Sequence, residues 1–297
     1  MAELTPSGSD KPGRLRATLR SLVPKRFRSD IPIVPVLRFS GVIGFSTPLR
    51  PGLTLAGTAR ALDRAFATRK AKAVALLINS PGGSAVQSHL IYARIRQLAE
   101  EKKLPVIAVV EDVGASGGYM IACAADEIIA DPSSIVGSIG VVGGSFGFNK
   151  LIEKLGIERR LYTSGERKAM LDPFLPEQAE DVERLKALQK DIHEDFIALV
   201  KARRRKLDGP EKTLFSGEYW TGRRALELGL VDALGDLRGT LRARYGDKVV
   251  TPLVAAERGL FGRRVPGVRE ELWGRPGLAD EIVSALEARA LWARYGL

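Results

Sequence analysis

A serine flanked by glycines is the clearest candidate nucleophile in the chain. Ser116 lies in Gly114-Ala115-Ser116-Gly117-Gly118, between an apolar run typical of a strand and a shorter one typical of a helix. Glycines on both sides permit a sharp turn that leaves the serine hydroxyl exposed. The N–H of Gly117, at the start of the helix, can donate to an oxyanion. Taken alone, the motif fits a structural turn equally well.

Histidine is a poor candidate for the base that such a serine requires. The chain has two histidines, and His89 precedes Ser116, whereas α/β-hydrolases place theirs downstream. His193 falls inside a long predicted helix beside its apolar stripe, where a structural role is favoured. A lysine can take the place of histidine only if it is neutral. Because an ordinary lysine has a pKa of about 10.4, this requires burial or a nearby cation.

Lys168 is the candidate for that base. It lies in residues 164–174, which mix apolar and charged side chains, favour neither helix nor strand, and follow a strand predicted over residues 159–163. The residues by themselves favour an ordinary lysine in a surface loop.

Alternating strand and helix patterns predict the scaffold that positions these residues. Strands are expected over residues 33–39, 73–78, 105–110 and 127–130, and helices over residues 56–68, 84–101, 119–125 and 176–206. Such alternation predicts an α/β fold with a largely parallel sheet and outer helices. Ligands bind such sheets at the carboxyl ends of the strands. Two glycine-rich loops, residues 79–83 and 114–118, lie at those ends.

Composition limits the partners and the compartment. The 297 residues are 45% hydrophobic and carry 46 basic and 35 acidic side chains, a formal charge of +11. The basic clusters have no interleaved aromatic residues, so no nucleic-acid partner is expected. The single cysteine, Cys123, is expected to be a buried packing residue in a reducing compartment. Because no run approaches the roughly 18 apolar residues of a membrane span and no signal-peptide pattern is present, a cytoplasmic location is expected.

Three regions are predicted along the chain. Residues 1–32 form a basic arm, and leucines recur at helical spacing among its arginines. This pattern fits either a peripheral amphipathic helix at the inner face of the membrane or a solvated basic arm, with the second slightly favoured. Residues 33–250 form the main domain. Residues 251–297 form an extension with an amphipathic helix over residues 280–295.

Five segments taken together resemble the S49 peptidases, the signal peptide peptidase A group, which share the ClpP/crotonase-like fold. These segments are residues 79–83, 114–119, 137–141, 163–174, and 220–225 with 229–232. Each is weakly specific alone, but their order and spacing over about residues 33–240 are specific. The resemblance implies repeated β-β-α units and a homo-oligomer.

The resemblance also implies a role for each candidate residue. Ser116 would be the nucleophile and Lys168 the base of a Ser-Lys dyad. The N–H groups of Gly83 and Gly117 would hold the oxyanion, and the hydroxyl of Ser138 would orient the lysine.

The implied activity is that of a serine endopeptidase. Its substrates would be small or membrane-derived peptides such as signal-peptide remnants, and it would need no cofactor or metal. Whether Gly82 or Gly83 supplies the N–H group stays open at this stage. Many members of the family carry an N-terminal membrane anchor, for which the basic residues between Arg14 and Arg28 could provide a peripheral substitute.

Two alternatives remain. A crotonase-like acyl-CoA enzyme would bind a thioester with backbone amides and would need no nucleophilic serine. Residues 220–232 also fit that fold. A catalytically inactive scaffold would have kept the fold alone.

Overall fold

A computed structural model describes residues 31–44, 53–165, 167–254, 286 and 289–296. All but the last two residues of the predicted basic arm lie outside these ranges, and so does the first part of the helix predicted over residues 280–295. Both alternatives for this basic arm, a peripheral membrane helix and a solvated segment, therefore stay predictions.

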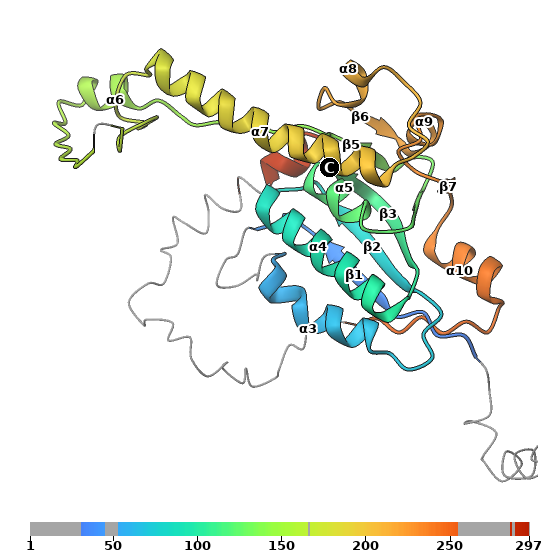
Figure 1. The fold of residues 1–297 in the computed structure, drawn as a ribbon. Coiled ribbons are helices and arrows are strands. Elements are labelled where there is room, and N and C mark those ends of the chain that lie inside the picture. Colours follow the sequence, from blue (N-terminus) through green and yellow to red (C-terminus); the bar gives the residue numbers. More distant parts are fainter. Residues whose placement is uncertain (1–30, 45–52, 166, 255–285, 287–288, 297) are drawn as a thin grey trace, which may run out of the picture.

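A seven-stranded, mostly parallel sheet forms the centre of the fold (Figure 1). Its main path runs through β1 (Val36–Ser40), β2 (Val74–Ser80), β3 (Val106–Ala115), β4 (Glu127–Ala130) and β7 (Ala233–Leu234). Two further strands, β5 (Ile135–Gly137) and β6 (Tyr219–Thr221), extend the sheet beside the last residues of β3. β6 is antiparallel to β5, and every other pair is parallel. The predicted α/β fold is confirmed.

Helices cover both faces of this sheet. The described residues include α3 (Leu55–Phe66), α4 (Ala85–Lys102), α5 (Gly117–Ala122), α6 (Asn149–Lys154), α7 (Ala179–Arg203), α8 (Glu211–Leu214), α9 (Gly222–Glu227) and α10 (Leu237–Tyr245). Ser84 begins α4 as its N-cap, and its side chain accepts a hydrogen bond from the N–H of Gln87. Within the described part of the chain, no helix is long and apolar enough to cross a membrane.

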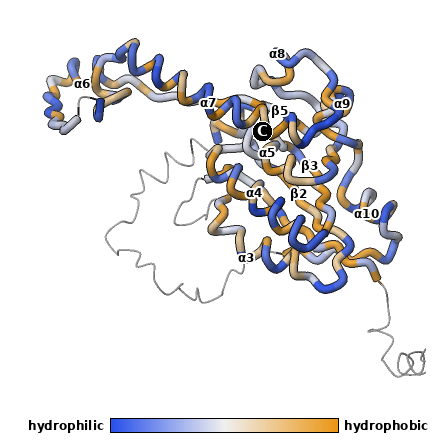
Figure 2. The backbone as a smooth tube through the Cα atoms, viewed as in Figure 1, coloured by the Kyte–Doolittle hydropathy of each residue, from blue (hydrophilic) through white to orange (hydrophobic). Residues whose placement is uncertain are grey.

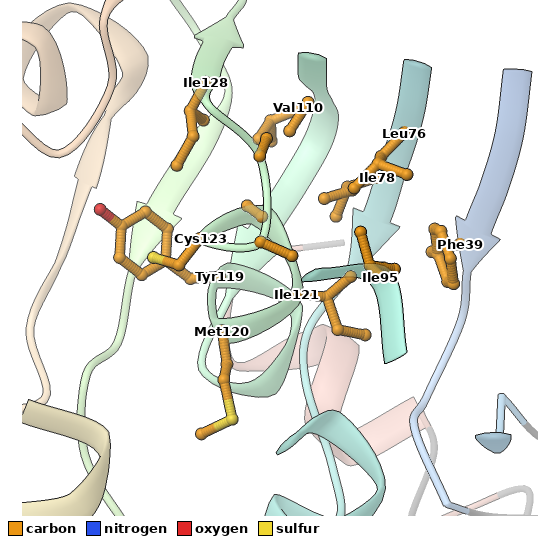
Figure 3. Close-up of a cluster of buried hydrophobic side chains, with 14 of the residues drawn as sticks. Phe39, Leu76, Ile78, Ile95, Val110, Tyr119, Met120, Ile121, Cys123 and Ile128 are labelled. Atoms are coloured by element: carbon orange, nitrogen blue, oxygen red, sulfur yellow. The ribbon is translucent and has the colours of Figure 1, made fainter. Parts of the chain in front are cut away.

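Successive side chains of the central strands point to opposite faces of the sheet, so the core has two layers. Val74, Leu76 and Ile78 of β2 face the larger layer beneath α3, α4 and α5, whereas Ala75 faces the smaller layer beneath α10. Figure 3 shows Leu76 and Ile78 pointing toward the side chains of α5. Every residue of α5 is buried. The short helix that follows Ser116 is therefore part of the core and fixes the position of the serine.

β3 is longer than the sequence predicts. Its first half pairs with β2 and β4, and its last three residues, Val113 to Ala115, pair with β5. Glu111 and Asp112 lie between these halves and break the apolar run, which is why the prediction ends at residue 110. The extension carries the strand up to Ser116.

Residues 141–178 and the N-terminal half of α7 form an arm that projects from the body (Figure 1). Large apolar side chains are exposed along it; they include Val142, Phe146, Leu151, Leu155, Leu161, Tyr162 and Leu188. Figure 2 shows that hydrophobic and hydrophilic residues are mixed along the tube around α6. The strand predicted over residues 159–163 is wrong, because these residues are exposed and form no strand.

Candidate active site

Three loops meet where β2, β3 and β5 end. Ser80 of β2 is in register with Gly114 of β3, and Ala115 is in register with Gly137 of β5. Ser116 directly follows β3, and Ser138 directly follows the paired strand β5. The Ser116 N–H donates to the Gly137 carbonyl at 2.8 Å. The structure thus places the backbone of the predicted nucleophile next to that of the serine predicted to orient the lysine.

Ser116 has a backbone conformation that residues other than glycine rarely adopt. Its φ is 51° and its ψ is −123°, at the N-cap of α5. Such a conformation stores about 1–3 kcal/mol of strain and persists only when the surroundings enforce it. The residues before and after Ser116 are buried, but Ser116 itself is partly exposed. The turn predicted from the glycine-flanked motif is confirmed, and it presents the serine at the surface.

Close packing at this turn leaves no room for side chains at two glycines. A Cβ atom at Gly117 would lie 2.2 Å from the Oγ of Ser88 on α4. A Cβ atom at Gly82 would lie 2.8 Å from the Cβ of Ser116. The two glycine-rich loops therefore touch, and the glycines are required by this approach as well as by the turn.

The loop after β2 presents one free amide. The N–H of the buried Gly82 donates to the Oγ of Ser80 at 3.2 Å. Gly83 is exposed and forms a parallel bridge with Ile43. The two hydrogen bonds of this bridge use the neighbours of Gly83: the Ile43 N–H donates to the Gly82 carbonyl, and the Ser84 N–H donates to the Ile43 carbonyl. The N–H of Gly83 therefore faces away from Ile43, and it has no acceptor among the described residues.

The amide of Gly117 is a second donor that has no acceptor among the residues the structure describes. As the first residue of α5, Gly117 has no intrahelical acceptor for its N–H. The glycine loop that carries Gly83 approaches this amide, because a Cβ atom at Gly82 would lie 2.9 Å from the Gly117 nitrogen. Two donors thus flank the partly exposed Ser116.

Ser138 is held by bonds from several elements. It is 6% exposed, with φ at 52°. Its N–H donates to the Glu218 carbonyl at 2.6 Å, and its Oγ accepts from the hydroxyl of Tyr295 at 3.2 Å. The next residue, Ile139, accepts at its carbonyl from the Nε2 of His193 at 3.0 Å. This confirms a structural contact for His193, whereas no sequence pattern indicates that Tyr295 reaches this site.

The structure places Lys168 away from Ser116. It is exposed, and its neighbour Arg167 pairs with Glu180 in the first turn of α7 at 3.1 Å. α7 passes the site thirteen residues later at His193, about 20 Å along a helix that rises 1.5 Å per residue. Figure 1 shows the segment around residue 168 beside α6, at the far end of the arm from α5. One chain alone therefore does not bring Lys168 to Ser116.

An ion pair with one buried partner links the end of α7 to the loop before β7. Arg204, which is 6% exposed, pairs with Asp232 at 2.7 Å and donates to the Gly229 carbonyl. Burial alone would raise the pKa of Asp232, but the hydrogen bond from Arg204 and another from the Ile128 N–H hold it below its usual value. This pair ties the end of α7 to the loop before β7.

Cys123 directly follows α5 and is fully buried, as predicted. Burial raises the pKa of its thiol to about 12, and Figure 3 shows it beside Tyr119. The Tyr119 hydroxyl donates to the Leu230 carbonyl at 2.7 Å. Both side chains therefore serve packing. Among the residues that the structure describes, no group of His, Cys, Asp and Glu could hold a metal ion.

Comparison with known proteins identifies what the chain resembles. Residues 98–248 match the model of peptidase family S49. A candidate protease of Synechocystis is 36% identical over 258 residues, which are 83% of this chain and 89% of that protein. The chloroplastic serine protease SPPA of Arabidopsis thaliana is 40% identical over 174 residues, which are 57% of this chain and 25% of that protein.

Two further similarities carry less weight. The Na(+)/H(+) antiporter NhaA of Brucella abortus is 55% identical over 290 residues, which are 95% of this chain. The chain spans only 39% of the length of that protein, so the name describes a much longer molecule. A mutant of the 1510-N membrane-bound stomatin-specific protease has 19% identity and a TM-score of 0.45 over 77% of this chain and 95% of its own.

Proposed function

The chain belongs to peptidase family S49, and we propose that it is a serine endopeptidase whose nucleophile is Ser116. The observation that carries this proposal is the strained, partly exposed Ser116 at the N-cap of a buried helix, near two amides that have no acceptor in the described part of the chain. Strained residues cluster at active sites, where the surrounding structure enforces them.

The amides of Gly83 and Gly117 are the proposed oxyanion donors. The N–H of Gly82 is already bonded to Ser80, which supports Gly83 as the donor from that loop. Removing one such donor from a serine peptidase costs about 3–4 kcal/mol of transition-state stabilisation.

The base, in this proposal, is Lys168 of a second copy of the chain. The arm holds Lys168 far from its own Ser116 and exposes large apolar side chains along its length. A second copy that received this arm would cover those side chains and enclose the lysine, which supplies the burial that a neutral amine requires. Because the arm and the site are different surfaces, the contact is heterologous, and the homo-oligomer we propose is a ring in which the rotation between copies closes.

The proposed reaction uses only residues of the chain. Neutral Lys168 accepts the proton of Ser116 as Oγ attacks a peptide carbonyl, and the two amides stabilise the oxyanion. The lysine then protonates the leaving amine, and the C–N bond breaks to leave an acyl ester on Ser116. Water attacks this ester with the same lysine as base, which releases the acid and restores the hydroxyl. We propose small or apolar extended peptides, including signal-peptide remnants, as substrates.

A peptide-library digest tests the function. Ser116→Ala and Lys168→Ala are each expected to abolish cleavage. Matched controls are Ser133→Ala and Lys154→Ala, which change an exposed serine and another lysine of the arm and are expected to leave cleavage intact. Full activity in Lys168→Ala would remove the lysine from the mechanism, and full activity in Ser116→Ala would refute the proposal altogether.

Two further assays separate the alternatives. A crotonase-like enzyme predicts acyl-CoA turnover that survives Ser116→Ala, and an inactive scaffold predicts no labelling of Ser116 by a serine-reactive phosphonate. The peptidase proposal predicts labelling of Ser116 and no acyl-CoA turnover.

A further inference from the structure

Ser80, the last residue of β2, is fully buried where the two glycine-rich loops of the site touch. Its Oγ donates to the Gly41 carbonyl at 2.6 Å and accepts from the N–H of Gly82 at 3.2 Å. Both directions are fixed, because a carbonyl can only accept a hydrogen bond and a backbone N–H can only donate one. The single hydrogen of this hydroxyl is therefore committed to Gly41.

The Ser80 hydroxyl completes a set of bonds that ties the loop after β2 to the segment after β1. The N–H of Gly41 donates to the Asn79 carbonyl at 2.9 Å, and the Gly41 carbonyl accepts from Ser80. Further along both segments, the N–H of Ile43 donates to the Gly82 carbonyl at 2.8 Å. The loop is thus bonded on both sides of its first glycine.

Two of these bonds hold the conformation of Gly82. Its φ is 98°, and glycine has no Cβ atom to limit rotation. The bond to Ser80 holds the peptide group before the Gly82 Cα, and the bond from Ile43 holds the peptide group after it. The second peptide group carries the N–H of Gly83. Because a peptide group is planar and trans, this N–H points opposite to the Gly82 carbonyl, and the rotation held at Gly82 sets its direction.

Ser80 also packs against the turn that carries the nucleophile. A Cβ atom at Gly118, the second residue of α5, would lie 2.5 Å from the Ser80 carbonyl oxygen and 3.2 Å from its Cβ. The backbone of Ser80 therefore contacts the turn after Ser116, while its hydroxyl holds the loop that carries Gly83. Because the side chain is fully buried, it does not touch a substrate.

We propose that Ser80 is a positioning residue that holds the N–H of Gly83 in the direction of the oxyanion. This rests on the proposed function, in which the amides of Gly83 and Gly117 stabilise that charge. Such a donor accelerates the reaction because its direction is set before the charge develops, and a misplacement of about 1 Å can cost about 100-fold in rate. Loss of the Ser80 hydroxyl leaves the bond from Ile43 in place, so we expect a smaller loss of about tenfold.

The test is Ser80→Ala, assayed by peptide cleavage and by inhibition with a peptide aldehyde. The Oγ of Ser116 adds to the aldehyde carbon, and the former carbonyl oxygen then takes the place of the oxyanion. We expect kcat to fall about tenfold with KM within about twofold. The inhibition constant of the aldehyde should rise by about the same factor as kcat falls, because a transition-state analogue loses the interactions that the transition state loses.

Ser134→Ala is the matched control. Ser134 is also buried, and its Oγ accepts from the N–H of Asp131 at 3.0 Å and donates to the Glu111 carbonyl at 2.5 Å. This variant loses the same kinds of bond as Ser80→Ala, but at the residue before β5 and not in the loop that carries Gly83. Urea unfolding should therefore show a similar loss of stability in both variants, with kcat and the inhibition constant changed only in Ser80→Ala.

A merely structural role for Ser80 predicts equal kinetic changes in Ser80→Ala and Ser134→Ala per folded molecule, and that result would overturn the inference. Should Ser80→Ala fail to fold, Ser80→Cys supplies a weaker donor and acceptor and should show the same rise in the inhibition constant; a wild-type constant in this variant would also overturn the inference. Ser116→Ala separates the two claims. If it is inactive, failure at Ser80 leaves the proposed function standing, whereas cleavage by Ser116→Ala would refute the proposed function itself.

Discussion

Adding a single methyl group at Gly117 should disable the site, and removing one oxygen atom from the neighbouring helix should partly restore it. The Cβ atom of Gly117→Ala would lie 2.2 Å from the Oγ of Ser88, 3.2 Å from its Cβ and 3.3 Å from the Cδ1 of Ile43. The first distance is far too short for two non-bonded atoms to keep their places, whereas the other two require shifts of a few tenths of an ångström. The start of α5 must therefore move away from α4, and Ser116 must move with it.

The structure sets the expected size of this effect. A displacement of about 1 Å at a nucleophile can lower the rate about 100-fold, and overpacking of this kind destabilises a fold by about 1–3 kcal/mol. Gly117 is helical and has no positive φ, so no backbone strain adds to the steric effect. Ser88→Ala alone loses only the bond from Oγ to the Ser84 carbonyl, at a cost of about 1 kcal/mol or less.

The assay compares wild type, Gly117→Ala, Ser88→Ala and the double variant by peptide cleavage and by urea unfolding. We expect Gly117→Ala to lose about 100-fold in kcat/KM. The double variant should recover at least about tenfold of that loss, because the atom at 2.2 Å is gone. If Gly117→Ala cleaved peptides with the kcat/KM of the wild type, or if the double variant recovered no activity, the packing account of this turn would be refuted.

Two further predictions concern Cys123 and the ion pair between Arg204 and Asp232. Because the pKa of Cys123 is raised to about 12, the thiol should resist iodoacetamide at pH 8 in the folded protein and react only after urea unfolding; rapid reaction in the folded state would contradict its burial. Asp232→Ala removes the carboxylate partner of the buried Arg204, which keeps only its bonds to the Gly229 carbonyl, so urea unfolding should show a loss of about 1–2 kcal/mol. Since the folded pKa of Asp232 lies below its unfolded value of about 3.9, its stabilising contribution is present above that pH and is lost as the pH falls toward the folded pKa. The stability difference between wild type and Asp232→Ala should therefore shrink below about pH 4; a difference that stays constant down to pH 2 would count against the pair.

The sequence predicts the parts of the site that are encoded locally. Ser116 is identifiable because a serine between glycines, at the junction of a strand and a helix, is typical of a tight turn that exposes the hydroxyl. The turn before Gly83 is identifiable because proline and glycine end a buried apolar run. Both predictions depend on short-range geometry, which a chain carries in adjacent residues.

The parts of the site that depend on distant contacts cannot be predicted from the residues. Tyr295 meets Ser138 across 157 positions, and its position within an amphipathic pattern indicates only a packing face. The strand expected over residues 159–163 has apolar and β-branched residues but no neighbouring strand to pair with among the described residues. Lys168 is identified by family resemblance alone, and no sequence pattern indicates how far an arm holds a lysine from its own serine.

Complementation between two inactive variants tests the central claim most directly. Ser116→Ala and Lys168→Ala chains are each expected to be inactive alone, because each lacks one half of the dyad. When the two are co-expressed in equal amounts, random assembly leaves about one quarter of the sites with an intact Ser116 and an intact Lys168 from different copies. A dyad shared between copies therefore predicts about one quarter of wild-type cleavage in the mixture. No cleavage by mixed assemblies, or undiminished cleavage by Lys168→Ala alone, would contradict it.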